Sequence, residues 1–155
     1  MTPREARRRF ASLPVARLAT ADATGRPHLV PMVFALDGDT VAGAVDHKPK
    51  RTAALRRLAN IAANPHVCLL VDHYEEDWTR LWWARADGTA RVTDAAGPEG
   101  SRALRLLCER YPQYRDRTPG GPVVLVSVHR WSGWAAGAGM HGAIPDAEAG
   151  GGTSP

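Results

Sequence analysis

The stretch that decides the fold is VAGAVDHKPKRTAALRRLANIAANPHVCLLVDHY, residues 41–74. Its first five residues are small and apolar, and the apolar run 67–71 near its end has the length of a buried strand. Between these runs, Asn64-Pro65 marks the end of a helical segment. The apolar residues of that segment recur at the spacing of one helical face, which we expect to be buried: Leu55, Leu58, Ala59 and Ala62.

The start of this helix carries an unusual charge pattern. Lys48, Lys50 and Arg51 stand at or just before its first turn, and five basic residues but no acidic one lie in residues 48–57. Cations there repel the free N–H groups of the helix start unless an anion is bound. With an anion present, the N–H groups and the side chains attract one charge together. The pattern predicts a phosphate site, and ordinary solvated surface charge remains the alternative.

Composition bounds the class of protein. A chain of 155 residues with 44% hydrophobic residues is long enough for one self-supporting domain. No apolar run approaches the ~20 residues of a membrane span, and the N-terminus lacks the apolar segment of a signal peptide. The two cysteines, Cys68 and Cys108, are expected as buried thiols, which with no export signal predicts a cytoplasmic protein.

Charge is unevenly distributed. The formal net charge is +4, and residues 1–60 hold eleven Lys/Arg against five Asp/Glu, whereas the remainder hold nine against eleven. A basic half concentrates anionic small molecules or nucleic acid, and composition does not choose between them.

The rest of the chain is predicted to be mainly strands. Thr2-Pro3-Arg4-Glu5 is a capping box that opens a short helix to about residue 11. Residues 15–21, 28–36 and 41–45 are expected to form a three-stranded meander. Further strands are expected at 67–74, at 80–92 with a bulge at Asp87-Gly88, and at 123–129. A second helix should begin at Pro98, with Leu104, Leu107, Cys108 and Tyr111 on one face.

Six or seven strands with short turns and two inserted helices predict a mainly β fold, a small antiparallel barrel. A doubly wound sheet would need a helix after nearly every strand. We expect residues 1–136 to form this domain and residues 137–155, rich in Gly and Ala, to form a disordered tail.

Several short motifs, in order, resemble those of one family. They are Val15-Ala16-Arg17-Leu18-Ala19-Thr20, Gly25-Arg26-Pro27-His28, Pro31-Met32-Val33-Phe34, Asp46-His47-Lys48-Pro49-Lys50-Arg51, Asn64-Pro65-His66-Val67 and Trp131-Ser132-Gly133-Trp134. The chain resembles the pyridoxamine-5′-phosphate-oxidase-like proteins with a flavin-binding split β-barrel. Within that class it is most similar to the branch that uses the deazaflavin coenzyme F-420.

The resemblance implies a homodimer with two cofactor sites at the subunit interface. The cofactor, F-420 or alternatively flavin mononucleotide (FMN), would lie along the second strand on main-chain groups of Pro31, Met32 and Val33. Its phosphate would be held by Lys48, Lys50 and Arg51, with Lys50 ranked first. His47 and Trp131 are further candidate cofactor contacts, and no catalytic side chain is assigned.

Two function classes follow. The first is a cofactor-dependent oxidoreductase that transfers a hydride between reduced F-420 and a small organic substrate, since a bound deazaflavin or flavin supplies hydride chemistry itself. The second is a non-catalytic barrel that binds FMN, F-420, a heme-like tetrapyrrole or nucleic acid, of which nucleic acid is the least favoured.

Two further patterns each allow a functional and a structural interpretation. The pairs Asp46-His47 and Asp72-His73 end two strands and could bind a metal, but ordinary strand-end polar residues are the preferred interpretation. The five tryptophans could stack nucleobases, but aromatic residues of a dimer interface and pocket are preferred: Trp78, Trp82, Trp83, Trp131 and Trp134.

Overall fold

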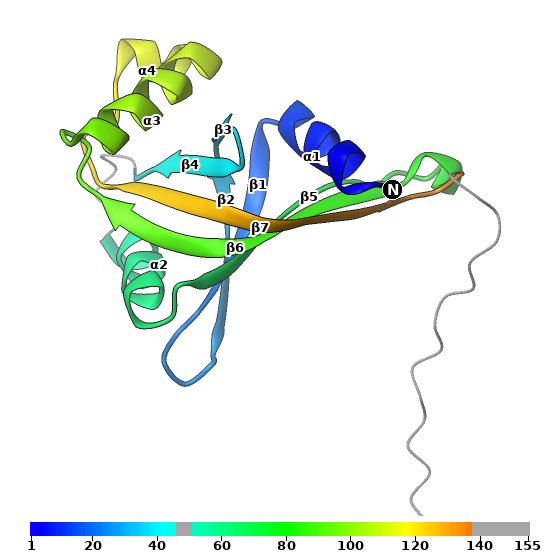
Figure 1. The fold of residues 1–155 in the computed structure, drawn as a ribbon, viewed down its shortest axis with the longest axis horizontal. Coiled ribbons are helices and arrows are strands. Elements are labelled where there is room, and N and C mark those ends of the chain that lie inside the picture. The colour runs from blue at the N-terminus through cyan, green and yellow to red at the C-terminus, as the bar shows by residue number, and fades with distance from the viewer. Residues whose placement is uncertain (46–50, 138–155) are drawn as a thin grey trace, which may run out of the picture.

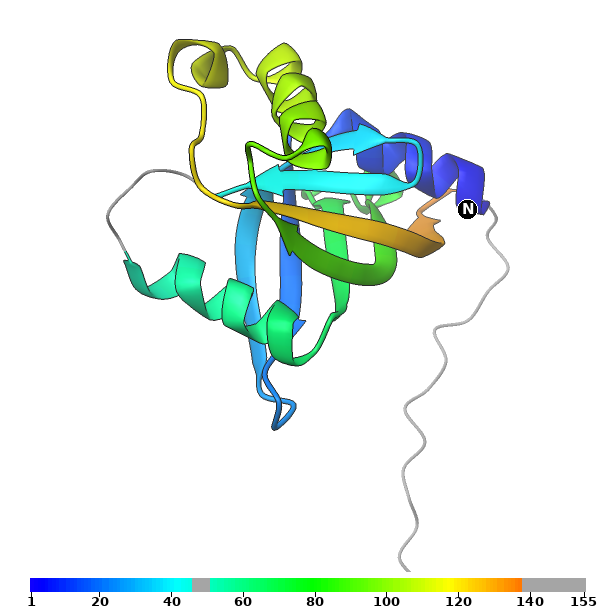
Figure 2. The same cartoon turned by 60° about the vertical axis from the view of Figure 1, so that its left-hand side comes forward.

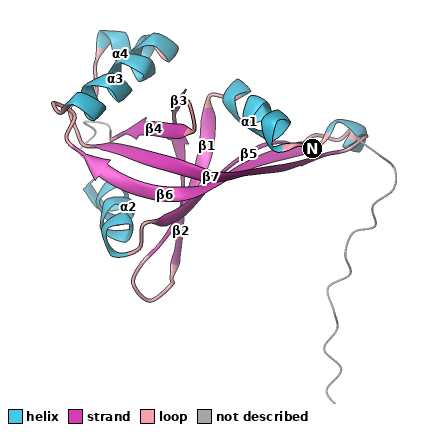
Figure 3. Cartoon of the chain, viewed as in Figure 1, coloured by secondary structure: helices cyan, strands magenta, loops and turns pink. Residues whose placement is uncertain are grey.

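The structure is a computed structural model that describes residues 1–45 and 51–137, with only the backbone described for residues 51–55. Seven strands and four α-helices are arranged as a curled antiparallel sheet with helices at its periphery (Figures 1 and 3). The strands are β1 Val15–Ala21, β2 Pro27–Val33, β3 Ala35–Asp37, β4 Thr40–Ala44, β5 His66–His73, β6 Trp82–Thr93 and β7 Val123–Ala135. The helices are α1 Pro3–Ser12, α2 Arg51–Ala63, α3 Pro98–Arg110, α4 Pro112–Asp116 and the 3₁₀ turn η1 Trp78–Arg80. The mainly β split-barrel prediction is confirmed.

The strand order is β2-β1-β5-β6-β7-β4-β3, so both pairings of the predicted meander form, but as two separate hairpins, β1–β2 and β3–β4. The expected strand 28–36 is broken at Phe34 into β2 and β3, which lie at opposite edges of the sheet. Because one residue joins these edges, the sheet must curl until they meet. The break is held by Tyr111, whose hydroxyl accepts from Phe34 N–H at 3.1 Å and lies 2.7 Å from Phe34 O and 2.6 Å from Pro14 O.

Helix α1 begins as the capping box predicts. Thr2 Oγ1 accepts from Glu5 N–H, and the Glu5 carboxylate accepts from Thr2 N–H at 2.8 Å. The helix buries Phe10, whose ring centroid lies 4.9 Å from that of Phe34 and 5.2 Å from that of Trp131. Helix α1 therefore covers the interior of the curled sheet.

Helix α2 is confirmed, but its predicted buried face is only partly right: Leu58 packs half-buried against the core, and the side chain of Leu55 lies outside the described part. Ala59 and Ala62 are exposed, whereas Asn60 and Ile61 are buried. The cause is a polar contact: Asn60 Nδ2 donates to Thr20 Oγ1 at 3.0 Å, and both residues are at most 5% exposed. The helix thus lies near the turn end of the β1–β2 hairpin (Figure 2).

The bulge predicted in the long strand is confirmed as a register shift between Asp87 and Gly88. A side chain at Gly88 would collide with the main chain of Ser127, so glycine is required by close approach of β6 and β7. Strand β7 extends beyond the predicted residue 129 to Ala135, which places Trp131 and Trp134 within the sheet.

Helix α3 packs on the sheet near β3 and β4, with Ala103 and Leu107 buried (Figure 1). Cys68 and Cys108 are free thiols, as expected, but both are half-buried rather than buried. The predicted Pro-rich loop after Tyr111 contains the short helix α4. No helix in residues 1–45 and 51–137 is long and apolar enough to cross a membrane. Of the predicted tail, only Gly137 lies within the described residues.

Candidate functional site

Strand β2 is an edge strand with an available main chain. It pairs with β1 from Pro27 to Val33, and no strand of the described part of the chain pairs with its other edge. Met32 points inward and is 5% exposed, filling space left by Gly43 on β4. Pro31 is exposed and Val33 half-buried on the opposite face. The strand can therefore offer unpaired N–H and C=O groups to a ligand along its free edge.

The predicted phosphate residues fall largely outside the described residues: His47, Lys48 and Lys50 belong to that gap. Arg51 begins α2, and no acidic residue lies in the first turn of that helix. The helix start is thus positive in charge and in dipole, as an anion requires. The structure leaves the roles of these four residues as predictions.

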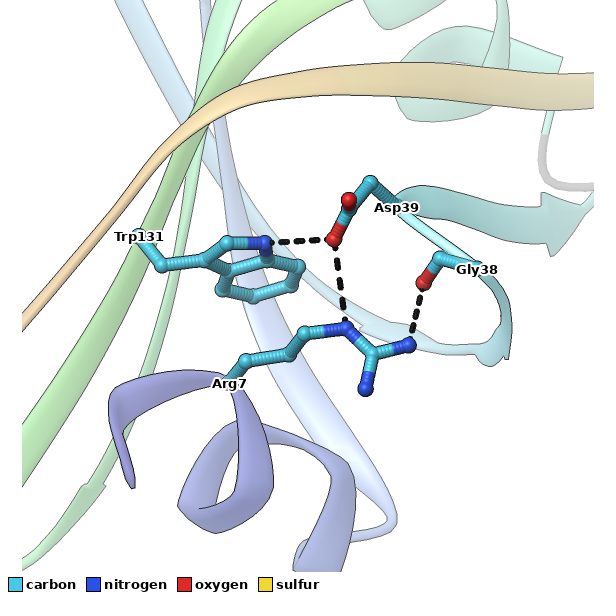
Figure 4. A network of polar contacts seen from close by, with 4 residues as sticks. All are labelled: Arg7, Gly38, Asp39 and Trp131. Carbon is cyan, nitrogen blue, oxygen red and sulfur yellow. Dashed lines mark hydrogen bonds and ion pairs between the residues drawn. The ribbon is translucent and has the colours of Figure 1, made fainter. Parts of the chain in front are cut away.

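Trp131 is positioned by a polar network that the sequence did not reveal (Figure 4). Its indole Nε1–H donates to Asp39 Oδ1 at 2.9 Å, and Arg7 Nε–H donates to the same oxygen at 3.2 Å. Arg7 also donates to the carbonyl of Gly38 at 2.5 Å. The network ties α1 and β7 to the β3–β4 turn, so Trp131 has at least a structural role.

The outer face of the sheet, defined as the surface of β1, β2, β5 and β6 that points away from Phe10 and α1, is apolar and hollowed. Two pockets of about 350 and 500 Å³ share Ala19 and Cys68 and together form a groove. Leu29 is 63% exposed at its rim, and Val15 on β1 is 40% exposed. The remaining groove residues are Arg17, Thr20, Ala21, Pro27, His66, Val67, Leu70, Trp83, Arg85, Asp87, Gly88 and His129.

Charges on this outer face are paired. Arg17 forms an ion pair with Asp72, and Arg85 contacts Asp87 at 2.9 Å. Burial raises the pKa of the Cys68 thiol, and the nearby Asp87 carboxylate adds to that rise. Cys68 is therefore held as a neutral thiol rather than a nucleophilic thiolate.

Of the two strand-end Asp and His pairs, Asp46-His47 lies outside the described residues, and the side chains of Asp72 and His73 contact other groups. Asp72 is engaged by Arg17, while His73 stacks on Trp82 and lies 3.3 Å from Glu75. No cluster of three or more His, Cys, Asp or Glu side chains suited to a metal occurs in the part of the chain that the structure describes.

A third, smaller pocket was missed from the sequence. It lies between the β1–β2 hairpin and α2, and is lined by Asp22, Arg26, Pro27, His28, Arg56 and Asn60. Arg56 was counted in the basic run of residues 48–57, but only the folded position of the hairpin brings Arg26 and His28 to it.

The curled sheet, the break at Phe34 and the free edge of β2 define the chain as a split-barrel protein. The chain matches the family described as pyridoxamine 5'-phosphate oxidase over residues 2–135 and belongs to that family. No curated protein sequence matches the chain at a significant level.

Solved structures share the fold at low sequence identity. The heme storage protein HutZ of Vibrio cholerae is 16% identical over 87% of this chain and 95% of that protein, with a TM-score of 0.66. A heme binding protein of Mycobacterium smegmatis is 20% identical over 88% of this chain and 55% of that one, with a TM-score of 0.69. A FAD-binding protein of Mesorhizobium loti is 18% identical over 86% and 94%, with a TM-score of 0.63. At these identities the likeness concerns the fold.

Proposed function

We propose that this protein is a homodimeric oxidoreductase that binds a flavin-type cofactor, with the deazaflavin F-420 as the first candidate and FMN as the second. The observation that carries the proposal is the free edge of β2, in a chain whose helix α2 starts with no acidic residue in its first turn. A flat ring with polar edges fits a row of unpaired main-chain groups, and a phosphate fits the start of α2. The similarity to a FAD-binding protein supports a flavin-type ligand.

The chain's own contribution is binding, orientation and exclusion of water. A bound flavin or deazaflavin supplies the hydride chemistry. The main chain of Pro31 and Val33 would orient the ring, and Arg51 with Lys50 would hold the phosphate. F-420 is ranked first because its phosphodiester and oligoglutamate tail suit the basic residues of the N-terminal half.

A second copy of the chain would cover the outer face. An apolar sheet surface with Leu29 and Val15 exposed is unusual for a monomer, and the half-buried Trp83 lies in its groove. Arg17 and Asp72 already pair within one chain, so this face can approach its own copy without leaving these charges uncompensated.

Dimerisation is tested by sedimentation of matched variants. Val15→Glu and Leu29→Glu should convert a dimer to a monomer and abolish cofactor binding. Val92→Glu is the control, because Val92 has the same 40% exposure as Val15 but lies on β6 outside the groove. A wild-type monomer at micromolar concentration would contradict the dimeric site.

Cofactor identity is tested by titrating the purified protein separately with F-420, FMN, heme and single-stranded DNA. We expect F-420 to bind most tightly. Lys50→Ala should weaken it about ten- to a hundred-fold, the value of a charge-assisted contact. Arg8→Ala, an exposed arginine of α1, is the charge-matched control. Equal losses in both variants would show that Lys50 acts only through net charge.

A non-catalytic heme binder is the second candidate. Two structural neighbours are a heme storage and a heme binding protein. In this chain the 500 Å³ part of the groove is lined by His66 and His129, and imidazole is a common axial ligand of heme iron. A heme titration in which His129→Ala abolishes a shift of the Soret band, with F-420 inert, would favour this function over the reductase.

A further inference from the structure

The small pocket between the β1–β2 hairpin and α2 has the size of a single oxyanion. Its volume is about 80 Å³. A cavity of about 10–15 Å³ holds one water molecule, so this pocket accommodates a group several times larger than water. It is spatially separate from the groove of the outer face, with which it shares only Pro27.

The charge of this pocket is predominantly positive. Arg26 and Arg56 both line it, and neither guanidinium forms an ion pair with a carboxylate anywhere in residues 1–45 and 51–137. Asp22 is the one acidic residue of the lining, and its Oδ1 is already occupied. That oxygen accepts from Thr24 N–H at 2.9 Å, from the Thr24 hydroxyl at 2.7 Å and from Arg26 N–H at 3.0 Å.

Asp22 is therefore engaged by the hairpin turn through Oδ1. The hydrogen bonds from the Thr24 hydroxyl and the Arg26 main chain lower the pKa of Asp22, and the charge of Arg26 also contributes to that lowering, so Asp22 stays ionised. One carboxylate faces two guanidinium groups, which leaves the pocket short of negative charge.

His28 lies in the lining of the same pocket. Its Nδ1 is enclosed by protein and has no hydrogen-bond partner among the described residues. An N–H on either ring nitrogen of a histidine can donate a hydrogen bond to an oxyanion.

Asn60 completes the lining from α2. Its amide donates one N–H to Thr20 Oγ1 at 3.0 Å, which fixes the orientation of the side chain. Two arginines, a histidine and an asparagine therefore line a space whose one acidic residue has its Oδ1 engaged by the hairpin turn.

We propose that this pocket binds a small oxyanion, a phosphate or a carboxylate group, through Arg26, Arg56 and His28. Planar guanidinium groups bind both oxyanions in a bidentate manner, so the two sources share one recognition chemistry. The site goes beyond the proposed cofactor function, because it needs neither a bound flavin nor a second subunit.

The test is a titration of the cofactor-free, full-length protein, monitored through the NMR signals of the His28 ring and the Arg56 Nε–H group. Inorganic phosphate and glutarate are titrated separately at constant pH and ionic strength, with chloride as the reference. Saturable shifts at both groups with phosphate, with glutarate or with both are expected, and the ranking tells phosphate from carboxylate. Shifts that do not saturate, or that chloride reproduces, would overturn the proposal.

Variants separate this pocket from the proposed cofactor phosphate site. Arg26→Ala and Arg56→Ala should each lower the affinity for the anion about tenfold, the effect of losing one charge-assisted contact at a solvent-accessible site. Arg8→Ala and Lys50→Ala should leave the His28 shift unchanged. If Lys50→Ala removes the shift and Arg56→Ala does not, the anion binds at the α2 start and this pocket is not a site. Failure of the cofactor titrations would not alter these outcomes.

Discussion

The contact between Asn60 and Thr20 should be one of the strongest single polar contributions to stability in the described part of the chain. Both side chains are almost fully buried, and the 3.0 Å hydrogen bond between them joins α2 to β1. The second contact of the Thr20 hydroxyl, to His28 O at 3.5 Å, is at the limit of a hydrogen bond. Removing the Asn60 amide therefore leaves a buried hydroxyl poorly satisfied.

Asn60→Ala should lower the free energy of unfolding by about 1–3 kcal/mol, the cost of an unsatisfied buried polar group. Thr20→Val removes the other partner at nearly constant volume. The double variant should be less destabilised than the sum of the single variants by about 0.5–1.5 kcal/mol, because the hydrogen bond can be lost only once. Urea denaturation of the wild type, the two single variants and the double variant gives these free energies from the shift of the midpoint, provided that the slope is unchanged.

Asn64→Ala provides the matched control. Asn64 stands just after α2 and is half-buried, with its side-chain oxygen accepting from His66 N–H at 3.2 Å. Its loss should combine additively with Thr20→Val. If the changes in unfolding free energy for Thr20→Val and Asn60→Ala also add within about 0.3 kcal/mol, the assigned contact is refuted.

Three further predictions concern other positions. Burial raises the pKa of Tyr111 above its ordinary value of 10.0, so the folded state holds this proton more tightly than the unfolded chain. The free energy of unfolding should therefore fall as the pH rises above about 10. Tyr111→Phe should start about 1–3 kcal/mol less stable at pH 8 and should lose less stability as the pH rises. Urea denaturation between pH 8 and 11 measures both effects. Gly88→Ala should destabilise more than Gly43→Ala, because the added methyl meets a main-chain carbonyl at Gly88 but only the flexible Met32 side chain at Gly43; equal melting temperatures would contradict this order. Asp39→Asn should cost at most about 1 kcal/mol, because the carboxylate is 66% exposed, while changing the indole fluorescence of its partner.

Local signals in the sequence predicted elements better than they predicted partners. The Thr2 capping box and the bulge at Gly88 were predicted correctly because each depends on a few adjacent residues. The division of the meander into two hairpins was missed because nothing local marks Phe34 as a break. The hydroxyl that satisfies its backbone comes from Tyr111, 77 residues away.

The buried face of α2 was predicted only in part, for a related reason. Ala59 and Ala62 are small enough for either face, whereas Asn60 would ordinarily be placed in solvent. Its burial depends on Thr20, 40 residues earlier. The small basic pocket was likewise invisible, because Arg26 and Arg56 come from elements that only the fold brings together. Of the proposed cofactor residues, the main chain of β2 is the part whose availability the structure supports.

The position of β4 has a consequence for synthesis on the ribosome. Apart from the short β3, the strand that pairs with β4 is β7, with Val41 opposite Val126 and Thr40 opposite Ser127. Before residues 123–135 have emerged from the ribosome, a nascent chain can pair β1, β2, β5 and β6, but β4 lacks its main partner. Contacts of such high sequence separation fold late and slowly. Chains truncated before Val123 should therefore expose unpaired strand edges and associate, and ribosome-bound chains should gain protease resistance only after β7 has emerged.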